Sequence, residues 1–257
     1  ARHKIPVIED ACQAHLGEWR KKKVGTWGAA GCFSFQASKN LNSGEGGAVL
    51  TNDTDLFHKC STFHSNGRNN HQPVDGYHQT GLNLRMTEFQ AALLMSQTDR
   101  YLRQAPIRRK NAEYLSSGFA DIPGLKPFRV IPKTSNHNYY QYMLRYDADA
   151  MSGLPVSKFT RAMQAEGISC GSRPDGGIMA GDSGVARMLR SPHFRRIYSA
   201  EQLRRAEASR DCPKALQLSR TMIQINQFLL LGSQADMDDI LTAARKVQRN
   251  AGALVKA

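Results

Sequence analysis

The sequence predicts an α/β protein with a large N-terminal part and a smaller C-terminal domain. Two observations predict it: short apolar runs near the N-terminus alternate with turn-rich stretches, and strand-like and helix-like segments alternate in the C-terminal half. The chain has 257 residues, 40% of them hydrophobic and 22% charged, which is enough for a sizeable core. A proline-bounded stretch at residues 123–132 separates the predicted domains, residues 1–118 and 123–257.

The first domain begins with short strands joined by polar turns. Apolar runs predict buried strands at residues 5–8, 31–35 and 48–51, and a turn-rich basic stretch predicts a surface loop at residues 17–28. The first run ends in Glu9 and Asp10. Ligands of α/β sheets gather at the carboxyl ends of the strands, so these acids mark a candidate site.

Helices complete the first domain. Capping side chains at Asn52, Asp53 and Thr54 predict a helix over residues 54–63. Residues 64–84 form a polar stretch too long for an ordinary connection, which favours a loop that is either functional or disordered. A long helix is expected from residue 87, with Pro106 kinking or interrupting it before a second stretch at residues 107–115.

The second domain is predicted as a smaller strand and helix arrangement. Strands are expected at residues 139–146 and 222–225, amphipathic helices at residues 156–165 and 235–247, and a Gly-rich loop at residues 171–184.

Composition narrows the class of protein. The five cysteines have no CxxC spacing, so neither a disulfide framework nor a metal site is expected, and a reducing, cytoplasmic setting fits best. No apolar run approaches the length of a membrane span, and no signal peptide is visible. The net charge of +13 makes nucleic acid a candidate partner, but the basic residues are scattered, so nucleic acid and membrane are not expected partners.

The densest chemistry lies in the Ser-, Asn- and Gly-rich loop at residues 36–47, which holds Lys39 between two predicted strands. Pyridoxal 5′-phosphate (PLP) needs an amine for its aldehyde, an acid for its ring nitrogen and donors for its phosphate, and Lys39, Asp10 and Ser34 are of these three types. Ordinary structural roles remain open: a solvated loop lysine, a helix-capping aspartate and a strand hydroxyl bonded to backbone.

Several segments in order resemble the DegT/StrS-type sugar aminotransferases, which are PLP enzymes of the aspartate-aminotransferase fold. The resemblance covers nearly the whole chain. It rests on residues 8–14 (IEDACQA), 33–39 (FSFQASK), 44–47 (GEGG) and 81–92 (GLNLRMTEFQAA), with weaker likeness at 137–140 and 166–168. The predicted fold is therefore the PLP-transferase fold, with a partial large domain and a small C-terminal α/β domain.

The resemblance implies a role for each matching residue. Lys39 matches the lysine that links covalently to PLP and moves the proton during transfer. Asp10 matches the acid that keeps the pyridine nitrogen protonated, Gln13 a residue beside the ring, and Ser34 a phosphate ligand. Asn83 matches an asparagine lent across a homodimer interface to the neighbouring subunit's phosphate, which would give the long polar loop a purpose.

The sequence also departs from the family. Gln36 stands where many members carry His, which would alter substrate contacts. The N-terminal part of the large domain is absent from this sequence, and with it a phosphate-binding turn, an aromatic ring on PLP and much of the sheet. The chain is therefore expected to expose apolar sheet surface and to lack about half of a complete cofactor pocket.

The resemblance implies transamination of a nucleotide-linked keto-sugar or of a cyclitol, with an amino acid such as glutamate or glutamine as the amino donor. Such a reaction belongs to amino-sugar, polysaccharide or secondary-metabolite biosynthesis. Three alternatives remain. A truncated, catalytically incompetent chain could serve only as a subunit or binding partner. A PLP-dependent sugar dehydratase would be expected to carry His in place of Lys39. A nucleic-acid-binding protein would need a contiguous basic face.

Overall fold

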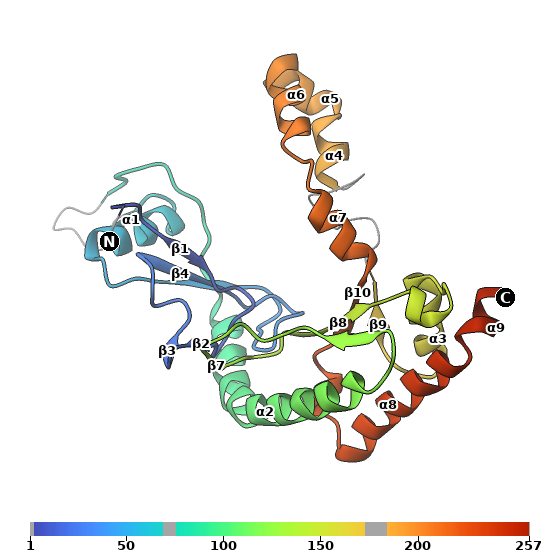
Figure 1. Ribbon diagram of the computed structural model, residues 1–257. Coiled ribbons are helices and arrows are strands. Elements are labelled where there is room, and N and C mark those ends of the chain that lie inside the picture. The colour runs from blue at the N-terminus through green and yellow to red at the C-terminus, as the bar shows by residue number, and fades with distance from the viewer. Residues whose placement is uncertain (1–2, 69–75, 173–183, 257) are drawn as a thin grey trace. The chain divides into compact units, whose positions relative to one another are not determined.

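The computed structural model describes residues 3–68, 76–172 and 184–256, and its elements are labelled in Figure 1. The chain divides into two compact units. The first comprises Ala1–Arg109 and Val130–Tyr140, and the second comprises Lys110–Arg129 and Gln141–Ala257. The expected domain limits at residues 118 and 123 stay a prediction.

Two small sheets organise the first unit. Its strands are β1 (Ile8–Asp10), β2 (Glu18–Trp19), β3 (Lys22–Lys23), β4 (Ala30–Ser34), β5 (Gly47–Leu50) and β7 (Thr134–Asn136). One sheet has the order β1-β4-β5 and the other β3-β2-β7. Strand β1 is parallel to β4, and β5 is antiparallel to it.

The predicted first strand is misplaced and is not buried. Pairing with β4 starts at Ile8, so the strand lies later than the expected residues 5–8. Ile5 is 71% exposed and Ile8 69%. The physical reason is that side chains of a strand stand on the faces of its sheet, and the face that carries Ile8 is left uncovered by the residues that the structure describes.

The basic stretch at residues 17–28 is more ordered than the predicted surface loop. Arg20 and Lys21 both take positive φ angles, 51° and 61°, and connect β2 to β3 in a two-residue hairpin turn. The Arg20 guanidinium lies 4.3 Å from the Trp19 ring centroid, a cation–π contact that helps hold the turn.

Helices α1 (Thr54–His64) and α2 (Glu88–Ala120) follow. The expected cap of α1 is confirmed, since the Asp53 carboxylate accepts a hydrogen bond from the Leu56 N–H at 3.0 Å. The predicted interruption at Pro106 is wrong: α2 runs through it as one helix (Figure 1). Proline removes a single N–H, and the turns on either side continue the helix.

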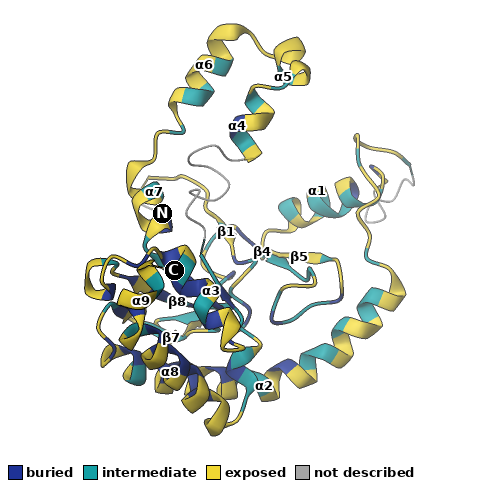
Figure 2. Cartoon of the chain, turned by 90° about the vertical axis from the view of Figure 1, so that its right-hand side faces the viewer, coloured by how far each residue is buried: buried dark blue, intermediate teal, exposed yellow. Residues whose placement is uncertain are grey.

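The second unit is built on a four-stranded sheet of order β6-β8-β10-β9. The strands are β6 (Leu125–Pro127), β8 (Gln141–Tyr146), β9 (Cys170–Gly171) and β10 (Met222–Asn226). Burial alternates along β8 and β10, and the buried face of α8 (Gln234–Arg249) includes Met237 and Leu241. Figure 2 shows this buried core around β8, α3 (Val156–Ala165) and α8.

Further helices of this unit were not predicted from the sequence. They are α4 (Gly184–Leu189), α5 (Pro192–Ile197), α6 (Ala200–Ala208), α7 (Pro213–Arg220) and α9 (Ala251–Lys256), with short 3₁₀ turns η1 (Asp149–Met151) and η2 (Leu229–Leu231). Most of the loop predicted at residues 171–184 lies outside the described residues. Ser191 and Ser199 cap α5 and α6 through their hydroxyls.

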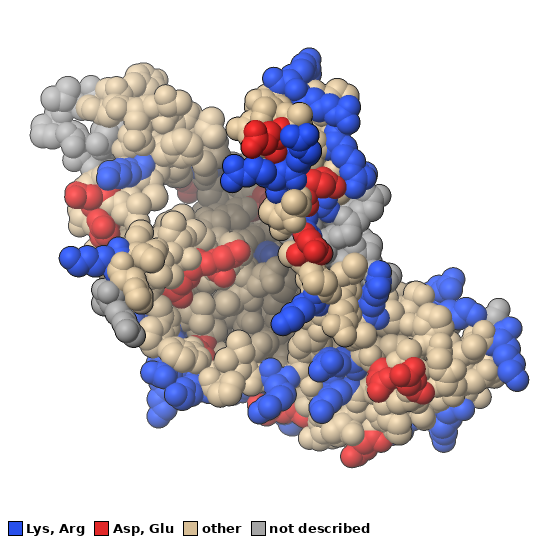
Figure 3. Space-filling model, turned by 45° about the horizontal axis from the view of Figure 1, so that its top comes forward, with Lys and Arg blue, Asp and Glu red and all other residues tan. Residues whose placement is uncertain are grey.

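On the face in Figure 3, Lys and Arg side chains are scattered, with a dense group on α4 to α6. Across the parts of the chain that the structure describes, no helix combines the length and the apolar character that crossing a membrane requires. The same described ranges hold no cluster of three or more metal-ligating side chains.

Candidate active site around Lys39

Asp10 and Ser34 share one face of the first sheet. Asp10, the last residue of β1, pairs with Cys32, and Ser34 lies two residues further along β4 on the same face. The Asp10 carboxylate accepts a hydrogen bond from the Cys12 N–H at 3.1 Å and is exposed. Hydrogen bonds from Cys12 hold the pKa of Asp10 below its usual value, and the positive charge of Lys39 adds to this. An accessible carboxylate is therefore available to a cationic group.

Lys39 sits in a turn that backbone hydrogen bonds close from several sides. Its own N–H donates to the Gln36 carbonyl at 2.9 Å, and the Asn42 amide donates to the Lys39 carbonyl at 3.0 Å. The base of the loop is closed by the Phe35 N–H, which donates to the Gly46 carbonyl at 2.8 Å. The lysine side chain is half-buried.

The segment at residues 136–140 ties the turn at Lys39 to the turn after β1. The Asn138 side-chain amide donates to the Gln13 carbonyl at 2.6 Å. The Asn138 carbonyl in turn accepts a hydrogen bond from the Asn40 side chain at 2.9 Å. The Lys39 Nζ lies 4.6 Å from the ring centroid of Tyr140. The fold therefore brings a late segment of the first unit against the candidate lysine.

Gln13 and Asn83 are exposed, and their expected roles stay predictions. The structure gives Gln13 a structural contact through its carbonyl, as described above, while its side chain is open to solvent. The Asn83 side chain accepts a hydrogen bond from Arg85 Nε at 3.0 Å, and its backbone forms a β-bridge with Ser65. Neither of these contacts involves the Lys39 turn.

The buried side chain of His15, which the sequence analysis did not single out, packs beside the strand that leads to the Lys39 turn. His15 is only 5% exposed and lies between the rings of Phe33 and Phe35, at centroid distances of 5.7 and 5.8 Å. Burial lowers the pKa of His15, so the imidazole is neutral near pH 7. Tyr101 donates a hydrogen bond to the His15 carbonyl at 2.8 Å. No periodicity marked these residues. The Tyr101 hydroxyl is satisfied by a distant segment, whereas the buried His15 Nε2 has no hydrogen-bond partner among the described residues.

The Glu9 side chain lies on the face of β1 opposite to Asp10 and binds the backbone of residues 25–28. Its carboxylate accepts hydrogen bonds from the N–H groups of Gly25, Trp27 and Gly28 at 2.7, 2.5 and 2.7 Å. Partial burial acts to raise the pKa of Glu9, but these bonds outweigh it and the pKa is lowered. Successive strand residues point to opposite faces of a sheet, so the hydrogen bonds of Glu9 do not occupy the face that carries Asp10.

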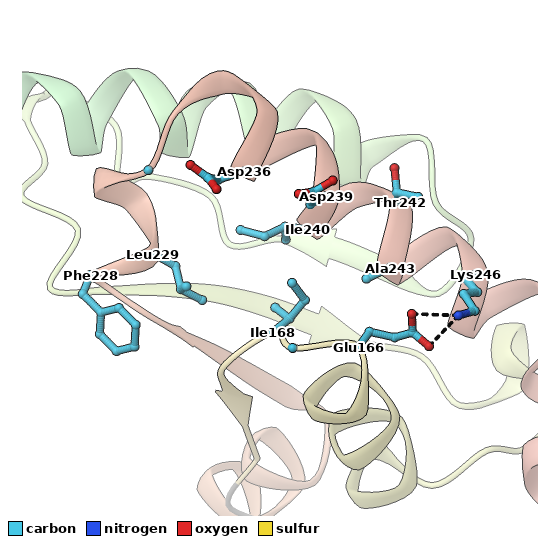
Figure 4. Close-up of a pocket in the computed structure, with 12 residues that line it drawn as sticks. Glu166, Ile168, Phe228, Leu229, Asp236, Asp239, Ile240, Thr242, Ala243 and Lys246 are labelled. Carbon is cyan, nitrogen blue, oxygen red and sulfur yellow. Dashed lines mark hydrogen bonds and ion pairs between the residues drawn. The ribbon is translucent and has the colours of Figure 1, made fainter.

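The second unit holds a separate pocket of about 570 Å³ that contains none of the predicted site residues. Figure 4 shows Ile168, Leu229 and Ile240 lining it and Glu166 paired with Lys246 at 2.8 Å. Of its carboxylates, Glu166 lies at the C-terminal end of α3, and Asp236 and Asp239 lie in the first two turns of α8. Asp236 is engaged in the capping box with Ser233. The amine and the acid of this pocket, Lys246 and Glu166, are paired with each other, and none of the residues expected to bind a cofactor lies there, so the candidate site remains in the first unit.

Comparison with known proteins shows to which family the chain is similar. A model of the DegT/DnrJ/EryC1/StrS aminotransferase family matches residues 1–172. L-glutamine:2-deoxy-scyllo-inosose aminotransferase of Streptoalloteichus tenebrarius is 35% identical over 268 residues, covering 98% of this chain and 61% of the relative. L-glutamine:scyllo-inosose aminotransferase of Streptomyces griseus is 31% identical over 264 residues, covering 97% and 60%. The chain thus spans about three fifths of the length of these relatives.

Solved structures share the fold. The structure of 3-amino-5-hydroxybenzoic acid synthase superposes with a TM-score of 0.73 at 23% identity, covering all of this chain and 62% of that one. Helicobacter pylori PseC, an aminotransferase involved in the biosynthesis of pseudoaminic acid, gives 0.74 at 21% identity, covering 97% and 61%. The predicted fold class is confirmed by these matches.

Proposed function

Because the chain belongs to the DegT/DnrJ/EryC1/StrS aminotransferase family, we propose that it carries the cofactor-linking lysine of a PLP-dependent aminotransferase. The proposed reaction moves the amino group of L-glutamine onto the ketone carbon of an inosose-type cyclitol. The observation that carries this proposal is the placement of Lys39, Asp10 and Ser34 in one unit, with the amine and the carboxylate within electrostatic reach.

The donor set around Lys39 fits PLP. The low pKa of Asp10 keeps its carboxylate ionised, which suits a protonated ring nitrogen. Ser34 offers a half-buried hydroxyl on the same sheet face for the phosphate, and Lys39 offers a primary amine for the aldehyde carbon. PLP supplies, when bound, an electron-withdrawing ring that allows an amino acid to lose its α-proton.

Lys39 is the residue proposed to move that proton. A primary amine on a flexible stem can accept a proton at Nζ from the α-carbon of the donor and return it at a neighbouring atom. The turn that holds the Lys39 backbone leaves the side chain free to make this short movement. The proposed role of Asp10 is different: its carboxylate stays ionised and stabilises positive charge, and it transfers no proton.

We propose a cyclitol ketone as the acceptor in preference to a nucleotide-linked keto-sugar. The relatives named above are inosose aminotransferases that use L-glutamine. An inosose bears hydroxyls and one ketone and no phosphate, so its recognition does not depend on the basic surface of this chain. Assembly as a homodimer with Asn83 reaching a neighbouring site is part of the same proposal.

Borohydride trapping tests the proposed lysine. The purified chain is mixed with PLP, reduced and digested, and the labelled peptide is identified by mass spectrometry. The label is expected on Lys39, to be lost in Lys39→Ala and kept in Lys59→Ala, an exposed helix lysine of the same unit. Equal labelling of many lysines in wild type and Lys39→Ala would reject Lys39 as the linking residue.

A transfer assay tests the substrates. L-glutamine labelled with ¹⁵N at its α-amino group is supplied with either 2-deoxy-scyllo-inosose or a nucleotide-linked keto-sugar. Label is expected in the aminocyclitol and not in the sugar, and Lys39→Ala should give neither product. Transfer to the nucleotide-linked sugar alone would overturn the cyclitol assignment. Trapping on Lys39 without transfer to either acceptor would indicate a chain that holds PLP but does not complete catalysis.

A further inference from the structure

We propose that Tyr140 is a positioning residue that holds the Lys39 amine in place whenever that amine is not linked to cofactor, an inference that rests on the proposed function. The Lys39 Nζ lies 4.6 Å from the Tyr140 ring centroid. An ammonium group within about 6 Å of an aromatic face is attracted by the ring quadrupole. The ring therefore gives the lysine side chain one preferred resting place beside its own turn.

The hydroxyl of Tyr140 is anchored to the turn that carries Lys39. It lies 3.0 Å from Ser38 Oγ, and Ser38 Oγ donates its proton to Gln36 Oε1 at 2.6 Å. A serine hydroxyl has a single proton, so the Tyr140 hydroxyl is the donor in its contact with Ser38. Gln36 Oε1 also accepts the Ser38 N–H at 2.8 Å, which fixes the acceptor. The ring and the lysine are thus attached to the same short turn.

The backbone on the other side of Tyr140 is fixed as well. Tyr139 has a φ of +47°, a conformation that is unfavourable for an aromatic residue. Such strain persists only where surrounding contacts hold it. Asn138 provides them through its bonds to the Gln13 carbonyl and from the Asn40 side chain. The strained residue turns the chain so that Tyr140 meets Lys39.

Positioning matters because the lysine must act more than once. In the proposed reaction the same Lys39 amine would serve both as the group that links the cofactor and as the base that moves the donor's α-proton. An unanchored lysine side chain samples many rotamers, which lowers the fraction of time its amine is in place. Tyr140 restricts the amine to one region through its ring face and itself transfers no proton and forms no bond.

Nuclear magnetic resonance tests the contact without PLP. Reductive ¹³C-methylation labels the lysines, and Lys39→Arg assigns the Lys39 resonance by its disappearance. The wild-type resonance is expected to be shifted upfield by the Tyr140 ring current. The shift should vanish in Tyr140→Leu, persist in Tyr140→Phe and persist in Tyr77→Leu, where an exposed tyrosine of the same unit is removed. An unshifted Lys39 resonance in the wild type would overturn the proposal, whether or not Tyr140→Leu folds.

Trapping rates test the consequence. The initial rate of borohydride-trapped linkage at Lys39 is expected to fall roughly tenfold in Tyr140→Leu and less than about threefold in Tyr140→Phe, because the phenylalanine keeps the ring face. Equal trapping rates in wild type and Tyr140→Leu would reject the positioning role of Tyr140 without contradicting the proposed function. A ring-shifted Lys39 resonance in a wild type that never links PLP would instead reject the proposed function.

Discussion

The phenolic hydroxyl of Tyr101 and the backbone carbonyl of His15 are joined by a 2.8 Å hydrogen bond across 86 residues of sequence. Tyr101 belongs to α2 and is 2% exposed, and His15 follows the turn after β1. This single bond fixes the helix against the segment that carries the candidate acid.

Tyr101→Phe should therefore lower the free energy of unfolding by about 1–2 kcal/mol, because the His15 carbonyl would be buried without its donor. Urea unfolding followed by circular dichroism measures the change. Tyr77→Phe, at a tyrosine that is 71% exposed, serves as the control and should change stability by less than about 0.5 kcal/mol. Equal losses in both variants would mean that the bond does not stabilise the unit.

Glu9→Gln should destabilise the protein in a pH-dependent way. The folded pKa of Glu9 lies below its ordinary 4.5, so its stabilising contribution is fully present above pH 4.5 and is lost as the pH falls through the folded pKa. At pH 7 the variant should lose roughly 1–3 kcal/mol, and the difference from wild type should shrink on acidification. Unfolding midpoints between pH 3 and 7 measure this, with the exposed Glu113→Gln as control. A stability difference between wild type and Glu9→Gln that is constant across this pH range would show that the ionised Glu9 carboxylate does not stabilise the fold through these hydrogen bonds.

Gly31→Ala should be disruptive, whereas Gly171→Ala should be tolerated. A Cβ at Gly31 would lie 2.2 Å from the Gly25 carbonyl oxygen, and one at Gly171 meets nothing within 4 Å. Both glycines lie in strands, so the pair isolates the steric effect. Thermal unfolding should show a loss of about 1–3 kcal/mol or more for Gly31→Ala and a change below about 1 kcal/mol for Gly171→Ala. A reversed order would show that the turn at Gly25 adjusts freely.

Asp10→Asn should slow amino-group transfer by on the order of 100-fold, since a neutral amide cannot balance a positive ring nitrogen. The fall should appear in the rate of ¹⁵N transfer from L-glutamine, while trapping at Lys39 is largely kept. Asp55→Asn, at an exposed helix carboxylate, is the control. Transfer at the wild-type rate in Asp10→Asn would remove Asp10 from the proposed ring-nitrogen role.

Local patterns in the sequence predicted much of the fold, because they depend on neighbouring residues. The cap at Asp53, the strands around Lys39 and the strands β8 and β10 all follow from short-range preferences. The exposure of Ile8 could not be predicted, since an apolar run does not reveal whether another layer covers it. The single helix through Pro106 shows that the loss of one N–H did not outweigh the helical turns on either side.

The candidate site divides in the same way. The run from Glu9 to Gln13 and the turn at Lys39 could be read from motifs that lie close together in sequence. The contributions of Tyr140 and Asn138 depend on a chain segment about a hundred residues later, whose contacts are set by tertiary structure. His137 to Tyr140 resembled the family, but the pattern gave no reason to prefer a site role over core packing.

The return of residues 130–140 to the first unit has a consequence for synthesis of the protein. A nascent chain that has reached only residue 118 already contains Lys39 and Asp10. It still lacks Asn136 and Asn138, whose side chains bind the carbonyls of Leu16 and Gln13. Since domains fold as their residues emerge from the ribosome, the contacts that tie the turn at Lys39 to this later segment cannot form until residue 140 has been made. The lysine is therefore translated early and held in position late.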